Sequence, residues 1–310
     1  TEDPALIALK NSVYNNQAFE VETKNHNVSG QATISYQSKK RINGYATYAL
    51  SYKPIGLNLG GLPTANGQPM LELAEIKPEK VNHIEIGVKS NPTLKSTLNV
   101  SYFNSFIKDY QTLVQSAELG VNRGYLANAE KVRVQGIELD ANYKINKNFS
   151  FFGNFAYTDG KYLKFTNAPV PLEEVGGKSA FKDISGGLLP GISKITGSFG
   201  AEGQFSGHLI GLKGNYFLGI DTYFRSKFSS SASPSEFLNI DGYALLNARA
   251  GFRASNGLSI TLWGRNLTNK DYFEQLLPAS GSAGHYAAVL GDPLTYGITL
   301  KYTFIKSTEN

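Results

Sequence analysis

The chain contains no cysteine, and its 310 residues include one methionine and one tryptophan. The lack of cysteine excludes disulfide bonds and thiol chemistry, and it suits a protein that passes through an oxidising compartment. No run of 18 apolar residues is present, which excludes a membrane-spanning helix. The residues from Thr1 onward lack the pattern of a signal peptide.

Charge of one sign is not concentrated in the chain. The net charge of +5 is dispersed, and the only short basic run is Lys39-Lys40-Arg41. A nucleic-acid footprint needs Lys and Arg clustered on one surface, so the sequence predicts no nucleic-acid partner.

Residues able to catalyse a reaction or hold a metal are also scarce. The four histidines lie at positions 26, 83, 208 and 285, without the spacing of metal ligands. Glu173 and Glu174 form a carboxylate pair, but adjacent acids on an exposed segment lack the positioned neighbour that acid–base catalysis requires. We therefore predict no catalytic residue, no metal site, no cofactor and no enzyme activity.

What the sequence has in abundance is alternation of apolar and polar residues. In the stretch Leu294–Phe304 every second residue, from Leu294 to Phe304, is apolar, while Thr, Gly and Lys occupy the positions between. Alternate residues of a strand point to opposite faces, so one face is wholly apolar. The stretch also matches the roughly 9 to 11 residues of a tilted membrane-spanning strand. A soluble sandwich can use the same pattern, so the rest of the chain must decide.

The pattern recurs over residues 27–304, and its connections alternate between short and long. The short turns lie at 38–41, 91–95, 146–148, 206–207 and 256–257. The long loops lie near 54–78, 110–130, 159–190, 226–239 and 274–292. About eleven strands joined in this way predict an all-β fold, a transmembrane antiparallel β-barrel. Residues 1–26 are predicted to be a loop or a cut edge, and residues 305–310 a tail.

Charges on the polar face of the predicted strands indicate a wide barrel. Glu85, Glu138, Asp140, Arg249 and Arg253 all fall on that face. Inside a small closed barrel these charges would be buried at great cost, so the lumen must be wide and wet, or plugged by polar groups. Single-chain bacterial barrels have even strand numbers, and here the first and last strands run parallel. We therefore expect the second half of a barrel of about 22 strands.

Four segments, in this order along the chain, resemble the carboxyl-terminal barrel region of TonB-dependent outer-membrane receptors. The first is 77–89, with Glu79, Glu85 and Gly87; the second is 128–139, with Gly136 and Glu138; the third is 263–272, with Asn266, Leu267 and Tyr272; the last holds Gly291, Pro293, Tyr296, Gly297 and the terminal aromatic Phe304. Two departures are Leu294, where many members have arginine, and the extension past Phe304.

The resemblance implies import driven by the TonB complex acting on an amino-terminal plug domain, in the outer membrane of a Gram-negative bacterium. The plug and its TonB box are absent from the chain, which spans a partial receptor barrel over residues 1–310. The last two segments resemble receptors for iron complexes, so a ferric siderophore is the first expected ligand. Cobalamin, haem and small glycans remain open, as do a passive porin and a soluble β-rich adhesin or lectin. Outer-membrane lipid and the barrel-assembly machinery are the other implied partners.

Two sets of residues are candidates for contacts. In the predicted extracellular loops, Arg123, Tyr125, Arg225, Lys227, His285 and Tyr286 could meet an anionic chelate. The alternative is that they are solvated loop charges beside interfacial aromatic residues. The five charged residues of the polar face are expected to line the lumen and contact the missing plug.

Overall fold

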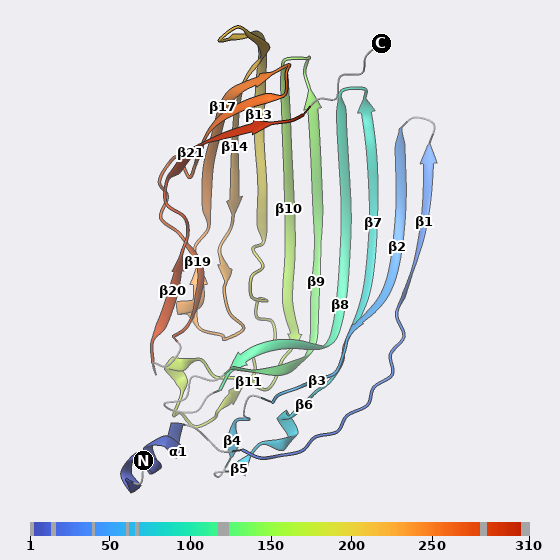
Figure 1. Ribbon diagram of the computed structural model, residues 1–310. Coiled ribbons are helices and arrows are strands. Elements are labelled where there is room, and N and C mark those ends of the chain that lie inside the picture. The colour runs from blue at the N-terminus through green and yellow to red at the C-terminus, as the bar shows by residue number, and fades with distance from the viewer. Residues whose placement is uncertain are drawn as a thin grey trace.

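The computed structural model describes residues 3–13, 17–38, 41–59, 62–65, 68–116, 124–279 and 284–304. Its main feature is one curved antiparallel sheet of eleven strands in the order β1-β2-β7-β8-β9-β10-β13-β14-β17-β18-β21 (Figure 1). Neighbours in the sheet follow one another in the chain order of these eleven strands. This confirms the predicted all-β class and the predicted number of strands. Among the described residues, no helix has the length and apolarity needed to cross a membrane.

The eleven strands differ in length, and the longest lie in the middle of the sheet. Their bounds are β1 Gly30–Ser38, β2 Ile42–Lys53, β7 Glu79–Thr93, β8 Ser96–Gln115, β9 Gly124–Lys144, β10 Phe149–Lys164, β13 Ile195–Leu209, β14 Leu212–Arg225, β17 Tyr243–Ala254, β18 Leu258–Arg265 and β21 Thr295–Tyr302.

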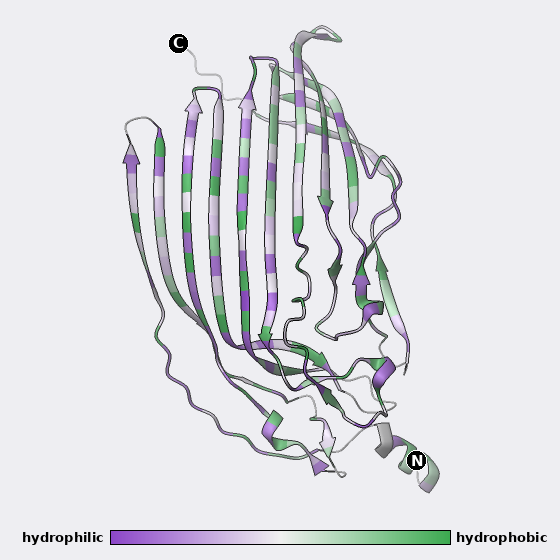
Figure 2. Cartoon of the chain, turned by 180° about the vertical axis from the view of Figure 1, so that it is seen from behind, coloured by the Kyte–Doolittle hydropathy of each residue, from purple (hydrophilic) through white to green (hydrophobic). Residues whose placement is uncertain are grey.

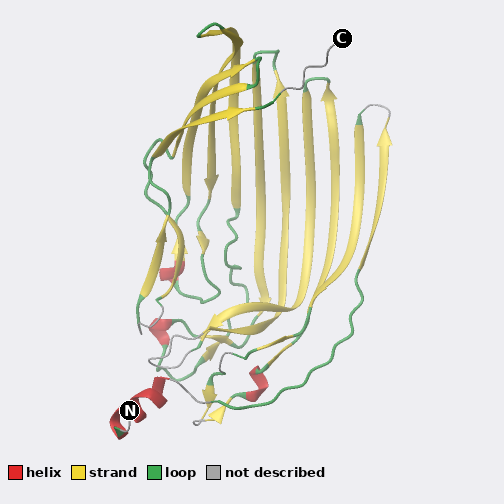
Figure 3. Cartoon of the chain, viewed as in Figure 1, coloured by secondary structure: helices red, strands yellow, loops and turns green. Residues whose placement is uncertain are grey.

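The long connections gather at one end of the sheet, and the short turns lie at the other (Figure 3). The connections contain short elements: β3 Gly56–Leu57, β4 Thr64–Ala65, β5 Gln68–Pro69, η1 Leu71–Leu73, β6 Glu75–Ile76, β11 Ala168–Pro169, η2 Leu172–Glu174, β12 Phe181–Lys182, β15 Phe228–Ser229, η3 Glu236–Leu238, β16 Asn239–Ile240, β19 Phe273–Pro278 and β20 Tyr286–Leu290. The helix α1, Pro4–Val13, lies at the same end, in a stretch for which the sequence predicted only loop.

The register gathers the apolar residues on one face. Paired residues of neighbouring strands share a face. One row across the first strands reads Tyr36, Gly44, Val88, Val100, Leu139 and Phe155. The large side chains of this face are exposed, for example Ile34 at 75% and Phe199 at 61%. Figure 2 shows the alternation along each strand. Such an apolar face, exposed over most of a sheet, is typical of a wall that meets lipid.

The alternation reverses on β8–β10 toward the long loops. Val132 has the parity of the polar face but is fully buried. Arg133 has the parity of the apolar face and lies 3.5 Å from Asp159. The reversal indicates that the surroundings of the sheet change at this level from apolar to aqueous.

This reversal explains two wrong predictions of loop bounds. The expected loop at 110–130 is largely strand, because β8 continues to Gln115 and β9 begins at Gly124. The expected loop at 159–190 likewise begins late, because β10 continues to Lys164. The apolar alternation stops where that face turns polar, although the hydrogen-bonded ladder continues.

The main buried cluster lies at the long-loop end, where the ends of β8, β9 and β10 meet the connections. Tyr162 and Phe165, 1% exposed each, pack with ring centroids 5.2 Å apart. Val114, Tyr125 and Leu189 join the same cluster. The cluster therefore holds the β10–β13 connection against the ends of β8, β9 and β10.

Two of the tight turns contain a glycine with positive φ. Asn256-Gly257 turns the chain as predicted, with φ 93° at Gly257. The turn expected at Ser206-Gly207 lies instead at Ile210-Gly211, because β13 and β14 stay paired as far as Leu209 and Leu212. Ile210 has φ 49°, which is uncommon for a β-branched residue, and Gly211 has φ 77°.

Candidate functional site

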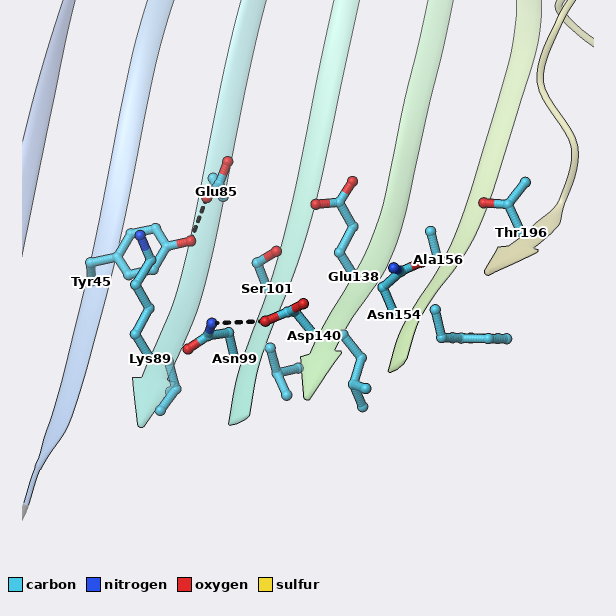
Figure 4. Close-up of a pocket in the computed structure, with 14 residues that line it drawn as sticks. Tyr45, Glu85, Lys89, Asn99, Ser101, Glu138, Asp140, Asn154, Ala156 and Thr196 are labelled. Carbon is cyan, nitrogen blue, oxygen red and sulfur yellow. Dashed lines mark hydrogen bonds between the residues drawn. The ribbon is translucent and has the colours of Figure 1, made fainter. Parts of the chain in front are cut away.

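The polar face carries the first candidate site, a shallow cavity of about 400 Å³ over β2–β13. Glu85 projects into it from β7, and Glu138 and Asp140 project into it from β9, with β8 between the two strands (Figure 4). The Tyr45 hydroxyl donates a 2.5 Å hydrogen bond to Oε1 of Glu85, and the Asn99 amide donates one of 3.4 Å to Asp140. Since Lys89 is the one basic residue among those that line it, the cavity is anionic.

A compensated charge network occupies the other half of the same face. Arg249 donates to Oε2 of Glu202 at 3.0 Å and to Oδ1 of Asp221 at 3.1 Å. Arg253 donates to the other oxygen of Glu202 at 3.0 Å. The Asn247 amide completes the network with a 2.9 Å bond to Asp221. The two arginines thus serve the two acids, whereas in the described part of the chain Glu85, Glu138 and Asp140 have no ion pair with an arginine or lysine.

The predicted polar-face residues therefore share one face. The row Lys144, Ser150, Glu202, Gly219 and Arg249 joins the two halves across five strands. Whether this face meets a plug stays a prediction.

Three of the four motif glycines lie beneath aromatic rings on the same face. A Cβ at Gly87 would lie 2.5 Å from the Tyr45 hydroxyl, and one at Gly297 would lie 2.6 Å from the Trp263 ring. A Cβ at Gly136 would lie 2.3 Å from the Tyr157 carbonyl oxygen and 2.8 Å from the Phe103 ring. These positions require glycine because a Cβ would collide with a ring of the neighbouring strand and, at Gly136, also with a carbonyl oxygen.

The motif around Asn266 is a clamp built on one buried side chain. Asn266, 3% exposed, donates to the carbonyl oxygens of Lys270 at 2.9 Å and Asp292 at 3.0 Å, and its Oδ1 accepts from Lys270 N–H at 2.8 Å. Asn266 and Asn269 have φ of 48° and 47°, a left-handed conformation that asparagine tolerates. The clamp fixes the point where β18 gives way to the last long loop.

Two further motif residues, Glu79 and Asn128, bond the backbone groups of β8 at a gap in the β8–β9 ladder. The β8–β9 ladder skips the pair formed by Asp109, whose φ is 54°, and Glu130. Glu79 accepts a 3.0 Å bond from the free Gln111 N–H, and the Asn128 amide donates a 2.7 Å bond to the Asp109 carbonyl. Glu130 instead holds Thr166 of the next loop through a 2.6 Å bond.

Three long loops meet at a second candidate site. The Tyr286 hydroxyl donates a 2.5 Å bond to Oε2 of Glu173 and lies 3.1 Å from Oγ of Ser235. We name these three residues the loop junction. Burial alone would raise the pKa of Glu173, but hydrogen bonds from Tyr286 and Ser235 hold that pKa below its ordinary value. Burial and the hydrogen bond to Glu173 raise the pKa of Tyr286 to about 12.

The structure separates the six predicted loop contacts. Tyr125 is wrong as a loop residue, since it lies on β9 and is 4% exposed. Arg225 supports the fold, donating to Oγ of Ser193 at 2.9 Å and lying 3.4 Å from the centre of the Phe228 ring. Lys227 and His285 are exposed at the long-loop end. Arg123 lies outside the described residues.

Sequence reasoning missed the partners of these residues. Tyr45, Asp221 and Ser235 were not among the predicted sites, and neither was Glu173. A usable signal existed for Tyr45, an aromatic residue at a polar-face position of its strand. No signal marked the loop junction, because its members lie far apart in sequence. Among the residues that the structure describes, no three His, Cys, Asp or Glu side chains are grouped to hold a metal ion.

An antiparallel sheet with one exposed apolar face, one charged face and its long loops at one end defines part of the wall of a membrane-spanning β-barrel. A family model for the TonB dependent receptor-like β-barrel matches residues 9–267, and the chain belongs to this family.

Two of the relatives found are named as a ferric-pyoverdine receptor and a probable siderophore receptor. The chain is 24% identical over 300 residues to the ferric-pyoverdine M114 receptor PbuA of Pseudomonas sp. strain M114, covering 94% of this chain and 32% of that protein. It is 22% identical to the probable TonB-dependent siderophore receptor PiuA of Acinetobacter baumannii, covering 92% of this chain and 35% of that protein. The chain thus spans about a third of the length of these relatives.

Solved structures show the same fold. The ferric yersiniabactin uptake receptor FyuA from Yersinia pestis aligns with a TM-score of 0.67 and 20% identity, covering 89% of this chain and 37% of that one. The copper transporter OprC aligns with a TM-score of 0.66 and 17% identity, covering 88% and 39%. Since receptors for different cargoes share the fold, the fold alone does not name the cargo.

Proposed function

We propose that the chain is the carboxyl-terminal half of the barrel of a TonB-dependent transporter in the outer membrane of a Gram-negative bacterium, and that the transporter imports a ferric siderophore. One observation carries the proposal: the sheet has an exposed apolar face and a charged face. Residues of the family motifs supply the glycines beneath its aromatic rings, the buried Asn266 and the hydrogen bond from Gln111 to Glu79. The relatives that bind ferric siderophores support the choice of cargo.

The two faces would divide the work. The apolar face would meet lipid, and the terminal aromatic Phe304, 90% exposed, would serve as the signal read by the barrel-assembly machinery. The anionic cavity around Glu138 would contact the plug domain, through which the TonB complex acts. A plug side presenting arginine or lysine to Glu85, Glu138 and Asp140 would satisfy these carboxylates.

The long-loop end would collect the ligand. Lys227 and His285 are the predicted contacts that remain exposed there, whereas Arg225 and Tyr125 support the fold. A ferric siderophore brings its own iron ligands, so the loops need only attract and orient the complex. The iron is cargo and not a resident cofactor.

Uptake measurements test the function. The full-length gene is expressed in a strain that lacks its own siderophore receptors, and uptake of a panel of iron-labelled siderophores is measured with and without TonB. We expect uptake of at least one ferric complex that stops when TonB is removed. Uptake that persists without TonB would identify a passive channel, and uptake of cobalamin alone would overturn the choice of cargo.

The loop contact has its own test. Lys227→Gln should weaken binding of an anionic ferric siderophore about fivefold at low salt, as expected for one lost charge near a binding surface. Lys178→Gln is the matched control, since Lys178 is also an exposed loop lysine and was not a predicted contact. Equal loss in both variants would show that only the net charge matters.

A further inference from the structure

The pairing of the strands brings four lysines into one row. Lys80 of β7 pairs with Lys108 of β8. Lys108 pairs in turn with Lys131 of β9, which pairs with Lys164 of β10. All four residues are exposed, and their strands are neighbours in the sheet (Figure 1). We name these four residues the lysine row. Their charge is dispersed along the sequence and becomes concentrated only when the strands pair.

The lysine row lies on the same side of the sheet as the apolar face. Along β8, Lys108 is an even number of residues from Val100 and Phe106, which are 40% and 48% exposed on that face. Paired residues share a face, so the partners of Lys108 lie on that side as well. Lys164 joins them because the β9–β10 ladder shifts register just before it. The row therefore lies on the opposite side from the anionic cavity.

The apolar face ends at the lysine row. Phe106 lies two residues closer to the tight turns than the row does, and Tyr52 pairs with Lys80 in the row itself. Arg133 and Lys161 pair with each other beside the row, on the same side of the sheet. Membrane barrels gather aromatic residues where acyl chains give way to headgroups. The long lysine stems can follow the apolar surface while their ammonium groups meet the headgroups.

Two carboxylates lie near the lysine row, but only one of them reaches a member of it. Asp159 is shared by Arg133 at 3.5 Å and Lys161 at 3.1 Å. Glu130 lies 3.8 Å from the ammonium of Lys164, at one end of the row. Among the residues that the structure describes, the other three lysines form no ion pair. The chain itself therefore does not cancel their charges.

Three uncompensated lysines on adjacent strands carry an energetic cost. Like charges directly opposite one another on a sheet destabilise it. Neighbouring strands are about 4.8 Å apart, so the backbones of Lys80, Lys108 and Lys131 lie within about 10 Å of one another. An anion bound to the row removes the repulsion. The position of the row at the end of the apolar face favours an anion that is attached to a lipid.

We propose that the lysine row binds the phosphate groups of anionic lipids in the leaflet that meets the long-loop end. The inference rests on the proposed placement of the barrel in a membrane, but not on the identity of its cargo. A lipid makes two contacts, because its phosphate meets the ammonium groups while its acyl chains cover the apolar face beside Phe106. A free phosphate makes only the first of them. Each lysine near an anionic surface strengthens binding about fivefold.

The test uses the full-length receptor, purified in a nonionic detergent and stripped of lipid. Native mass spectrometry gives its affinities for dioctanoyl phosphatidic acid, dioctanoyl phosphatidylcholine and inorganic phosphate. The variant K80Q/K108Q/K131Q removes the three lysines that form no ion pair. The variant K80R/K108R/K131R keeps their charge and shows whether a loss comes from charge or from folding.

A matched control removes the same charge from the other side of the sheet. The variant K95Q/K144Q/K213Q replaces three exposed lysines on the polar side, near the tight turns. A loss that depended only on net charge would be equal in the two glutamine variants.

We expect the wild type, the control and the arginine variant to prefer phosphatidic acid to phosphatidylcholine. K80Q/K108Q/K131Q should lose about a hundredfold in affinity for phosphatidic acid. Equal wild-type affinity for the two lipids, an unchanged affinity in that variant, or an equal loss in the control would overturn the proposal. Inorganic phosphate bound as tightly as phosphatidic acid would also overturn it, because the site would then serve a free anion.

Further measurements cover the remaining cases. If K80Q/K108Q/K131Q does not fold, wild-type titration at rising salt decides, because phosphate binding must weaken with salt and an unchanged affinity would refute it. A receptor that prefers phosphatidic acid yet imports no iron complex would contradict the transport proposal alone. A receptor that imports an iron complex without any preference between the lipids would contradict the lipid proposal alone.

Discussion

The Tyr286 hydroxyl donates a 2.5 Å hydrogen bond to Oε2 of Glu173, across 113 residues of sequence. The bond joins the β19–β20 hairpin to the loop that contains η2, and Ser235 adds the loop between β14 and β17. One phenol therefore couples the positions of three loops that no shared strand connects.

Removing that phenol should loosen the loops. Tyr286→Phe keeps the ring but loses both hydrogen bonds, and we expect a cost of about 1 kcal/mol, since a bond to a charged group at a partly exposed site is screened by water. Hydrogen exchange should rise in residues 172–175 and 286–290. Tyr296→Phe is the matched control, because Tyr296 is 82% exposed on the apolar face. Unchanged exchange in Tyr286→Phe would contradict a coupling role.

The loop junction should also depend on pH. The pKa of folded Glu173 lies below its ordinary value of 4.5, so its contribution is present above pH 4.5 and is lost as pH falls through the folded pKa. The pKa of folded Tyr286 is raised from 10.0 to about 12, so its contribution is complete below pH 10 and is lost as pH rises through about 12. Hydrogen exchange of residues 286–290 across pH checks both limits. In Glu173→Gln the acid limit should disappear.

The glycines under aromatic rings should not tolerate a methyl group. Gly136→Ala places Cβ against the Tyr157 carbonyl and the Phe103 ring, and we expect a loss of about 1–3 kcal/mol in the free energy of unfolding. Gly44→Ala, on the apolar face with nothing within 4 Å, should be neutral. Urea unfolding in detergent measures both variants. Equal stability of the pair would show that the β9 backbone can shift to make room.

The Asn266 clamp should be among the most sensitive positions. Asn266→Ala removes three hydrogen bonds from a buried, left-handed residue, and we expect a loss of about 3 kcal/mol or more. Asn269→Gly keeps the left-handed backbone and loses one exposed bond to Leu294 N–H, so about 1 kcal/mol is expected. Thermal unfolding of both variants checks the order, and a larger loss at Asn269 would refute the clamp.

The two arginines around Glu202 should act together. Either Arg249→Gln or Arg253→Gln leaves one arginine on Glu202, so each should cost about 1 kcal/mol or less. The double variant leaves Glu202 without a positive partner and should exceed the sum by about 1 kcal/mol. Adding Glu202→Gln should recover that excess. Strict additivity would mean that water already screens this part of the polar face.

Much of the fold was predictable because alternation and turn residues are local signals. Leu294–Phe304 shows this well: its period of two, the Asn256-Gly257 turn and the sequence of short and long connections predict an eleven-stranded antiparallel sheet. The same local signals failed at 110–130. There the sheet leaves its apolar surroundings, and the apolar and polar residues exchange faces. Pattern indicates which side chains share a face but not what surrounds that face.

The sites were less predictable for a different reason. Glu85, Glu138 and Arg249 share a face by parity alone, so the sequence could place them together. Glu173 meets Tyr286 only because separate loops pack over the buried cluster around Tyr162, and no local rule reports that packing. The charge of Arg225 led to the prediction that it contacts the ligand. In the structure Arg225 instead binds Ser193 and packs on the Phe228 ring, so it stabilises the fold.

The continuation of β8 and β9 past the reversal of their faces has a consequence for whatever approaches the long-loop end. The Asn58 amide donates to the Leu126 carbonyl at 2.9 Å, and Leu126 N–H donates to the Asn58 side-chain oxygen at 2.9 Å. These two bonds attach the connection after β2 to β9. A ligand arriving there would meet a hydrogen-bonded two-stranded ladder with a second segment bonded to it. Binding to these strand ends would cost little ordering entropy, because their backbone is already held by the ladder and by Asn58.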